Sequence, residues 1–142
     1  MAEAFRVRGG QRLSGCIEPV GNKNEALPAL AAALLTADEV VLDNVPDILD
    51  VRAMLELIAS LGVSVERRGP NTIALQAANL HAACLDSEVA RRIRGSFLLA
   101  GPLVARLGEA VMCEPGGDRI GRRRIDTHLL ALQQRTAQGA PG

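Results

Sequence analysis

The sequence predicts an α/β fold built from repeated α/β units, the second of them incomplete. Apolar residues recur at helical spacing in some segments and in short β-branched runs in others, and the two kinds alternate along the chain. The order helix, strand, loop, helix, strand, hairpin strand occupies residues 22–85 and begins again in residues 86–134. With 142 residues, 48% of them hydrophobic, the chain is long enough for a substantial aliphatic core.

Composition and charge exclude several classes of protein. The formal net charge is zero and aromatic residues make up 1% of the chain, so neither a basic field nor a stacking platform for nucleic acid is expected. The three cysteines have no CxxC spacing, which argues against a zinc site or a disulfide framework. No signal-peptide pattern and no apolar run of membrane-spanning length are present, and the sequence predicts a cytoplasmic protein with no membrane partner.

Two short strands and a buried helix are predicted first. Phe5–Arg8 alternates between apolar and basic residues, and Leu13–Val20 follows a Gly-Gly turn. A helix then starts near Asn22, with asparagine as a candidate cap, and runs to Leu35. It is apolar nearly all round, which predicts burial on several sides.

The first unit continues with a strand, a helix and a hairpin. Glu39–Asp43 predicts a strand, and Ile48–Leu61 predicts an amphipathic helix that ends at a glycine. Val63–Glu66 and Thr72–Leu75 flank a turn that contains Gly and Pro, which predicts a β-hairpin.

The second unit repeats this order without its hairpin. Helices are predicted over Asp86–Arg92, Phe97–Leu107 and Asp126–Gln134, with a strand at Ala110–Cys113. Residues 135–142 are polar and glycine-rich, which predicts a disordered tail after a structured portion of residues 1–134. Because the hairpin is missing, the sequence predicts a truncated chain.

A basic loop lies between the predicted strand and the last helix. Residues 115–128 contain a Gly-Gly-Asp core and four arginines. Arginine forks bind phosphate and carboxylate groups, and Asp118 among them is a candidate proton donor. Lys23 stands at a helix start, where a cation is unfavourable alone but useful beside a bound anion. Both features predict an anion site, although a solvated charge run and an ordinary surface lysine remain alternatives.

Six stretches in this order together resemble the UDP-N-acetylglucosamine 1-carboxyvinyltransferase (UDP-GlcNAc enolpyruvyl transferase) family. The resemblance covers about residues 5–134. Each stretch alone is a weak signal, and the set is specific. The stretches are Phe5-Arg6-Val7 with Leu13-Ser14-Gly15, Gly21–Pro28, Asn44-Val45-Pro46, Arg94-Gly95-Ser96, Gly101–Arg106 and Pro115–His128.

This resemblance implies an activity and a complete fold. Enolpyruvyl moves from phosphoenolpyruvate to the 3′-hydroxyl of UDP-N-acetylglucosamine, in the first committed step of peptidoglycan synthesis. The family uses no metal and no organic cofactor. Its fold is two globular domains, each an inside-out α/β barrel of three similar units around buried helices. The chain would supply the N-terminal part and be weakly active or inactive alone.

The resemblance also implies roles for individual residues. Lys23 and Asn24 match the pair that contacts phosphoenolpyruvate, with Lys23 also matching a catalytic residue, and Arg94 matches an arginine of the substrate site. Asp118 matches the catalytic proton donor on a mobile loop, where the commoner residue is cysteine. An aspartate needs a raised pKa to hold its proton near neutrality, and neighbouring arginines oppose that. The segment that matches the UDP-sugar contacts is Arg123, Arg124, Ile125, Asp126 and Thr127.

Two other functions fit part of the pattern. The related 5-enolpyruvylshikimate-3-phosphate synthase shares the fold and the donor substrate. A short product that binds the UDP-sugar without chemistry is the non-catalytic alternative. The sequence makes no prediction of the oligomeric state.

Overall fold

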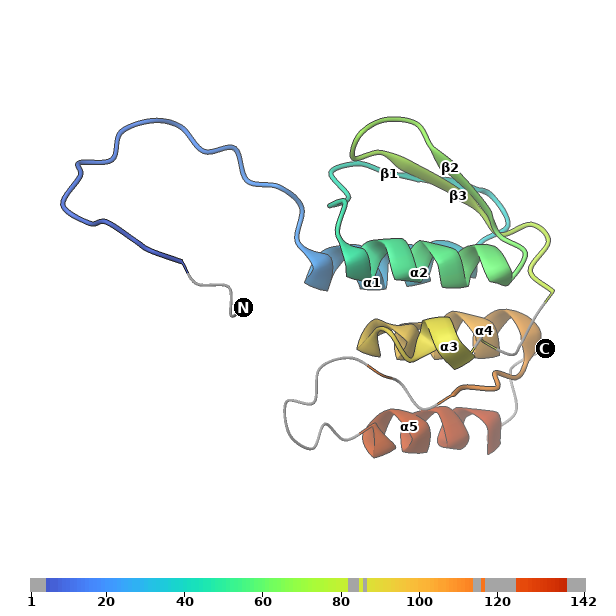
Figure 1. The fold of residues 1–142 in the computed structure, drawn as a ribbon. Helices are drawn as coiled ribbons and strands as arrows, with labels where there is room; N and C mark the ends of the chain where they lie inside the picture. Colours follow the sequence, from blue (N-terminus) through green and yellow to red (C-terminus); the bar gives the residue numbers. More distant parts are fainter. Residues whose placement is uncertain (1–4, 82–84, 86, 114–115, 117–124, 138–142) are drawn as a thin grey trace.

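The computed structural model describes residues 5–81, 85, 87–113, 116 and 125–137. A small sheet lies over the helices α1 (Lys23–Ala32) and α2 (Leu49–Ser60), and α3 (Ser87–Ala90) and α4 (Ala100–Leu107) form a further layer beneath them (Figure 1). Helix α5 (Asp126–Ala137) lies on the far side of α3 and α4 from the sheet (Figure 1). The described part of the chain therefore forms a mixed α/β fold with one antiparallel sheet.

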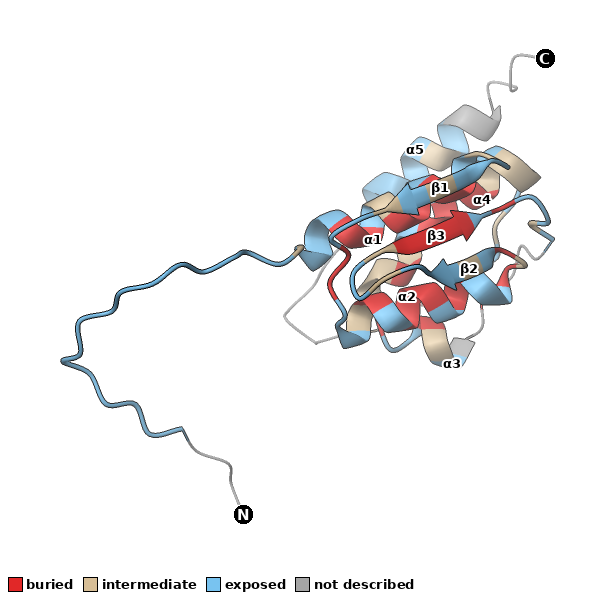
Figure 2. Cartoon of the chain, turned by 90° about the horizontal axis from the view of Figure 1, so that it is seen from above, coloured by how far each residue is buried: buried red, intermediate tan, exposed pale blue. Residues whose placement is uncertain are grey.

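The sheet has the strand order β1-β3-β2, and both pairings are antiparallel. β1 (Glu39–Leu42) pairs with β3 (Ile73–Gln76), and β3 pairs with β2 (Ser64–Arg67). The β2–β3 hairpin is confirmed, with each strand displaced by one residue from its prediction. β3 is central and its first three residues are buried, whereas the edge strands β1 and β2 are more exposed (Figure 2).

Two helices fill the space beneath the sheet. α1 (Lys23–Ala32) continues as a 3-10 turn, η1 (Ala33–Leu35), and α2 (Leu49–Ser60) follows β1. The prediction that the first helix is buried on several sides is confirmed, because α1 contacts α2 and also the 3-10 turn η2 (Arg94–Leu99) of the second half. Burial of large apolar side chains between these helices and the sheet stabilises the fold through the hydrophobic effect. The core side chains with almost no exposed surface include Leu30, Leu34, Met54, Leu57 and Ile58.

The second half is helical in the residues described. α3 (Ser87–Ala90) is shorter than the predicted helix, and the next predicted helix begins as a 3-10 turn, η2 (Arg94–Leu99), before α4 (Ala100–Leu107). α4 ends at Gly108, whose φ of 79° is the left-handed conformation that glycine adopts without a Cβ clash. α5 (Asp126–Ala137) includes three residues of the predicted tail, and residues 138–142 of that tail lie outside the described part.

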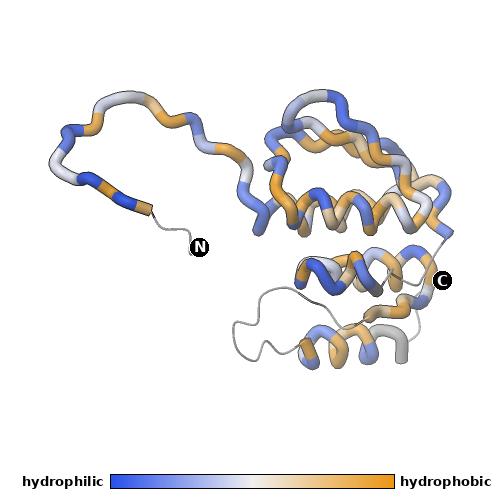
Figure 3. The backbone as a smooth tube through the Cα atoms, in the orientation of Figure 1, coloured by the Kyte–Doolittle hydropathy of each residue, from blue (hydrophilic) through white to orange (hydrophobic). Residues whose placement is uncertain are grey.

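Three predicted strands are wrong. Phe5–Arg8 and Leu13–Val20 form no strand, and residues 5–20 extend away from the body of the protein (Figure 1). Hydrophobic and hydrophilic residues alternate along this arm as the sequence indicated (Figure 3), but Phe5 is 97% exposed and Leu13 is 93% exposed. Of Ala110–Cys113, only Val111 forms a bridge, and its carbonyl accepts from the Leu85 amide at 3.3 Å. A β-strand forms only when it makes hydrogen bonds to a neighbouring strand. Alternation of apolar and polar residues within one segment does not provide that neighbour.

Candidate functional site

The first turn of α1 is closed by Asn22. Its side-chain oxygen accepts from the Asn24 amide at 2.8 Å, and its carbonyl accepts from the amides of Glu25 and Ala26. The backbone of Asn22 is extended, which is the usual conformation of an N-cap. The predicted cap is therefore confirmed, and Lys23 and Asn24 occupy the first two positions of the helix.

The loop between β1 and α2 presses directly on the start of α1. Gly21 donates its amide proton to the Asn44 side-chain oxygen at 3.1 Å. A Cβ atom at Gly21 would clash with the carbonyl oxygen of Asn44, so only glycine fits there. Asn44 itself has a φ of 56°, a left-handed conformation that asparagine tolerates. This contact fixes the start of α1 relative to the loop that leads into α2.

An ion pair joins the first turns of α1 and α2. The Nζ atom of Lys23 lies 2.6 Å from Oδ2 of Asp50. The lysine side chain is 51% exposed and the aspartate side chain 34% exposed, so both remain accessible to a solute. Lys23 is also the only lysine among the 16 lysine and arginine residues of the sequence. Lys23 was a candidate from the sequence and Asp50 was not, although a lone lysine signals a specific requirement at its position.

A tight turn places Arg94 at the first position of η2. The hydroxyl of Ser96, which is 1% exposed, lies 3.0 Å from the carbonyl oxygen of Ala90 and 2.9 Å from that of Ile93. A Cβ at Gly95 would stand 2.9 Å from Cδ1 of Leu27, so the absence of a side chain there lets η2 pack closely on α1. The turn therefore holds Arg94 beside the N-terminal half of α1.

A cavity of about 820 Å³ lies between α1, η2, α4 and α5. It brings together Lys23, Asn24, Arg94 and Ile125, which come from distant parts of the sequence. Asp50 and Arg92 add further charged groups to the lining, and neither was predicted from the sequence. The apolar part of the lining includes Leu27, Pro28, Phe97, Leu98, Ala131 and Leu132. The cavity is large enough for a substrate of moderate size and offers both charged and apolar surface.

The remaining predicted site residues have different outcomes. Asp126 and Thr127 begin α5 directly after Ile125, but they are not among the lining residues. Asp118, Arg123 and Arg124 lie outside the described residues. Within the predicted basic loop, Gly116 is described, and a Cβ there would clash with the carbonyl oxygen of Arg91. That contact places this glycine against the backbone that leads to Arg94.

An edge-to-face contact lies at the α5 wall of the cavity. The rings of Phe97 and His128 have centroids 5.8 Å apart at an interplanar angle of 83°. Such a T-shaped geometry is favourable because a ring edge meets a ring face. The contact joins η2 to α5 and so defines one side of the space between them.

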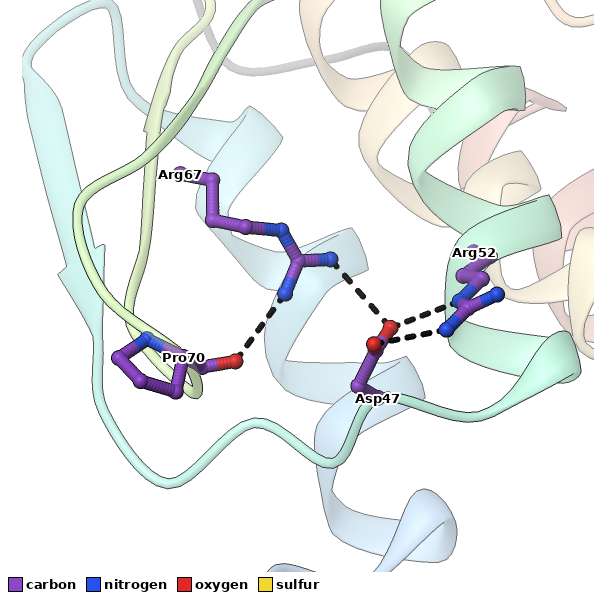
Figure 4. A network of polar contacts seen from close by, with 4 residues as sticks. All are labelled: Asp47, Arg52, Arg67 and Pro70. Carbon is purple, nitrogen blue, oxygen red and sulfur yellow. Dashed lines mark hydrogen bonds and ion pairs between the residues drawn. The ribbon is translucent and has the colours of Figure 1, made fainter.

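A second polar network supports the β1–α2 loop from outside the cavity. Arg52 donates two hydrogen bonds of 2.7 Å to the carboxylate of Asp47, and Arg67 donates to the same carboxylate and to the Pro70 carbonyl (Figure 4). The hydrogen bond from Arg52 is the main reason that the pKa of Asp47 lies below its ordinary value of 3.8. The network links the loop to the first turn of α2 and to the hairpin.

We expect this network to stabilise the fold in a pH-dependent way. Because the folded state lowers the pKa of Asp47, the stabilisation is present above pH 3.8 and is lost as the pH falls through the folded-state pKa. The Asp47→Asn variant should be less stable than the wild type in urea at neutral pH, and the difference should shrink in acid. A difference that stays constant from neutral pH down to acid would contradict this. Arg52→Gln should reproduce the effect, and the double variant should add little to either change.

The described residues offer neither a metal site nor a membrane span. No group of three or more His, Cys, Asp and Glu side chains in the described ranges is arranged to hold a metal ion. No helix in the described part of the chain has the length and apolar character needed to cross a membrane.

Comparison with known proteins identifies the family. A model of the EPSP synthase (3-phosphoshikimate 1-carboxyvinyltransferase) family matches residues 7–138. The chain belongs to this family. The EPSP synthase family match includes all the predicted site residues, from Lys23 to Thr127.

Within the family, the chain is similar to UDP-N-acetylglucosamine 1-carboxyvinyltransferases. It is 57% identical over 130 residues to that of Bradyrhizobium diazoefficiens, with 92% of this chain and 30% of the relative covered. It is 52% identical over 134 residues to that of Treponema pallidum, covering 94% of this chain and 32% of the relative. The predicted resemblance is therefore confirmed for the N-terminal part of these proteins. The chain spans only 30 to 32% of the length of these relatives.

A solved structure supports the family fold. The crystal structure of the enolpyruvyl transferase NikO from Streptomyces tendae matches with a TM-score of 0.62 and 32% sequence identity. The match covers 70% of this chain and 23% of that chain. The described α/β arrangement is thus that of part of an enolpyruvyl transferase.

Proposed function

We propose that the chain is the N-terminal part of an enzyme that transfers enolpyruvyl from phosphoenolpyruvate to the 3′-hydroxyl of UDP-N-acetylglucosamine. One observation carries this proposal: the cavity unites Lys23 and Asn24 of α1 with Arg94 of η2. The names of the relatives at 47 to 57% identity supply the acceptor, UDP-N-acetylglucosamine, and the carboxyvinyl group that is transferred. Phosphoenolpyruvate as the donor follows from the resemblance of the sequence motifs to the transferase family. The proposed cell process is peptidoglycan synthesis, and the proposed compartment is the cytoplasm.

The charges of the cavity suit phosphoenolpyruvate, which carries a phosphate and a carboxylate. The Lys23 ammonium adds its charge to the positive end of the α1 dipole, so the two can attract one anion together. The guanidinium of Arg94 can bind an oxygen pair in a fork geometry that an ammonium cannot offer. Asn24 can donate to a neutral or charged oxygen through its amide.

The proposed reaction is an addition followed by an elimination. The sugar hydroxyl releases its proton to solvent as its oxygen adds to C2 of phosphoenolpyruvate, while a proton is delivered to the methylene carbon with Asp118 as the proposed donor. A proton then leaves the resulting methyl group as phosphate departs from C2, which restores the double bond. Arg123 and Arg124 are proposed to bind substrate, with the segment Ile125–Thr127 beside the UDP-sugar. In the whole protein the chain would form the first units of an inside-out α/β barrel.

A non-catalytic role in UDP-sugar binding is the second candidate. It is favoured by the cavity lining, because charged and apolar groups together suffice for binding without any reaction. The third candidate is transfer to shikimate 3-phosphate, the acceptor suggested by the name of the family. Phosphate release from phosphoenolpyruvate in the presence of each acceptor separates these candidates. Saturable binding of the UDP-sugar without any release favours the second.

Replacing Lys23 tests the proposal within this chain. We expect Lys23→Met to weaken phosphoenolpyruvate binding at least tenfold, since the ammonium is removed while the length of the side chain is kept. Isothermal titration of both proteins measures this, with Arg68→Ala on the sheet as a control that should bind as the wild type does. Equal binding by Lys23→Met and the wild type would rule out a role for Lys23 in donor recognition.

A further inference from the structure

The Lys23–Asp50 pair joins the positive ends of two helices. Lys23 is the first residue of α1, and Asp50 is the second residue of α2. The Asp50 carboxylate is favourably placed at a helix N-terminus, whereas the Lys23 ammonium is unfavourably placed. The contact of 2.6 Å between them therefore compensates a cation that its own helix disfavours. Both residues line the same cavity.

The backbone that carries Asp50 is well fixed. The loop before α2 is held on α1 by the bond from the Gly21 amide to Asn44. The Ile48 amide bonds the Pro46 carbonyl at 3.1 Å, and the Ile48 carbonyl accepts from the Arg52 amide at 3.0 Å. Aspartate has a short side chain and lysine a long flexible one. A fixed carboxylate can therefore restrict where the ammonium goes.

An ammonium nitrogen has three N–H donors. One donor can remain on Asp50 while another bonds a substrate oxygen, so the ion pair and anion binding are compatible on the same nitrogen. We propose that Asp50 is a positioning residue, which holds the Lys23 ammonium at the cavity for an anionic phosphate or carboxylate group. This inference rests on the proposed function, because it assumes that Lys23 meets such an anion.

Two possible roles of Asp50 predict opposite changes in anion affinity when its carboxylate is removed. If Asp50 merely competes for Lys23, removing its negative charge strengthens anion binding. If Asp50 positions Lys23, removing it weakens binding, because the lysine must then be ordered by the ligand itself. The sign of the change in affinity for Asp50→Ala decides between them. Asp50→Asn keeps an oxygen that can accept from the ammonium and should lie between Asp50→Ala and the wild type.

The lone lysine makes the measurement direct. Growth with [15N]lysine gives a single backbone amide signal for the 142-residue chain, from Lys23 at the first position of α1. The shift of this signal is followed during titration with inorganic phosphate and then with phosphoenolpyruvate, in the wild type, Asp50→Ala and Asp50→Asn. Glu39→Ala is the matched control, because it removes an exposed carboxylate that pairs with Arg68 on the sheet.

We expect Asp50→Ala to weaken phosphoenolpyruvate binding about tenfold and Asp50→Asn to weaken it less, with Glu39→Ala unchanged. Unchanged or tighter binding by Asp50→Ala overturns the positioning role and leaves the proposed function standing. A wild-type signal that shows no saturable shift with either anion overturns both. If Asp50→Ala does not fold, the same comparison is made with Asp50→Asn, for which equal or tighter binding overturns the positioning role.

Discussion

Gly21→Ala should lower the free energy of unfolding by about 3 kcal/mol, since an added methyl group must displace its neighbours. The atom that its Cβ would meet is the Asn44 carbonyl oxygen, which belongs to the backbone and cannot rotate away. The shift would also strain the bond from the Gly21 amide to the Asn44 side chain. Domains of this size are stable by only about 5–15 kcal/mol, so the loss is a large fraction of the total.

The matched control for Gly21→Ala is Gly101→Ala. Gly101 lies in α4, and a Cβ there would meet nothing within 4 Å. Alanine is favoured over glycine in a helix, so Gly101→Ala should raise the free energy of unfolding by about 0.5–1 kcal/mol. Urea unfolding measures both changes. Similar losses at the two positions would show that the Gly21 contact has no special role.

Most of the first unit could be predicted from the sequence. The Leu49–Ser60 helix has apolar residues at helical spacing, and the β2–β3 hairpin has its strands around a Gly-Pro turn. Both signals arise within a short segment, and they determine local structure directly. The asparagine cap of α1 is a signal of the same kind.

The wrong strands had a pattern but no partner. Phe5–Arg8 and Leu13–Val20 alternate as strands do, yet pairing depends on where a neighbouring strand lies. In the described residues the sheet contains only β1, β3 and β2. The predicted strand Ala110–Cys113 is reduced to one bridge residue, Val111, for the same reason. The Val111 carbonyl accepts from the Leu85 amide, and the other three residues of the segment have no strand pairing. Non-local pairing is not encoded in the period of one segment.

The residues of the candidate site also differ in whether a local motif or the packing of distant elements identifies them. Lys23 and Arg94 could be selected from their motifs, and the structure places both at one cavity. Asp50 could not be selected in this way, because its role depends on how the first turns of α1 and α2 meet. Phe97 and His128 were likewise missed as partners, since their ring contact depends on the packing of α5 against η2.

Arg106→Ala should lower the free energy of unfolding by about 3 kcal/mol, because hydrogen bonds from a charged donor are lost and buried acceptors remain. The guanidinium donates to the Leu34 carbonyl at 2.9 Å and to the Ala77 carbonyl at 3.2 Å. Leu34 and Ala77 are both buried, so water cannot easily replace the arginine. These two bonds connect α4 to η1 and to the residue after β3, and thus tie the two halves of the chain together.

Arg68→Ala is the matched control for Arg106→Ala, because Arg68 also makes several polar contacts. It donates to the carboxylates of Glu39 and Glu66, and these contacts raise the pKa of Arg68 above its ordinary value. All three side chains are exposed on the sheet, where water and salt compensate for a broken ion pair. Urea unfolding should therefore separate Arg106→Ala clearly from the wild type and leave Arg68→Ala close to it. A larger loss of stability for Arg68→Ala than for Arg106→Ala would contradict this. It would mean that the exposed ion pairs of Arg68 stabilise the fold more than the bonds of Arg106 to buried carbonyls do.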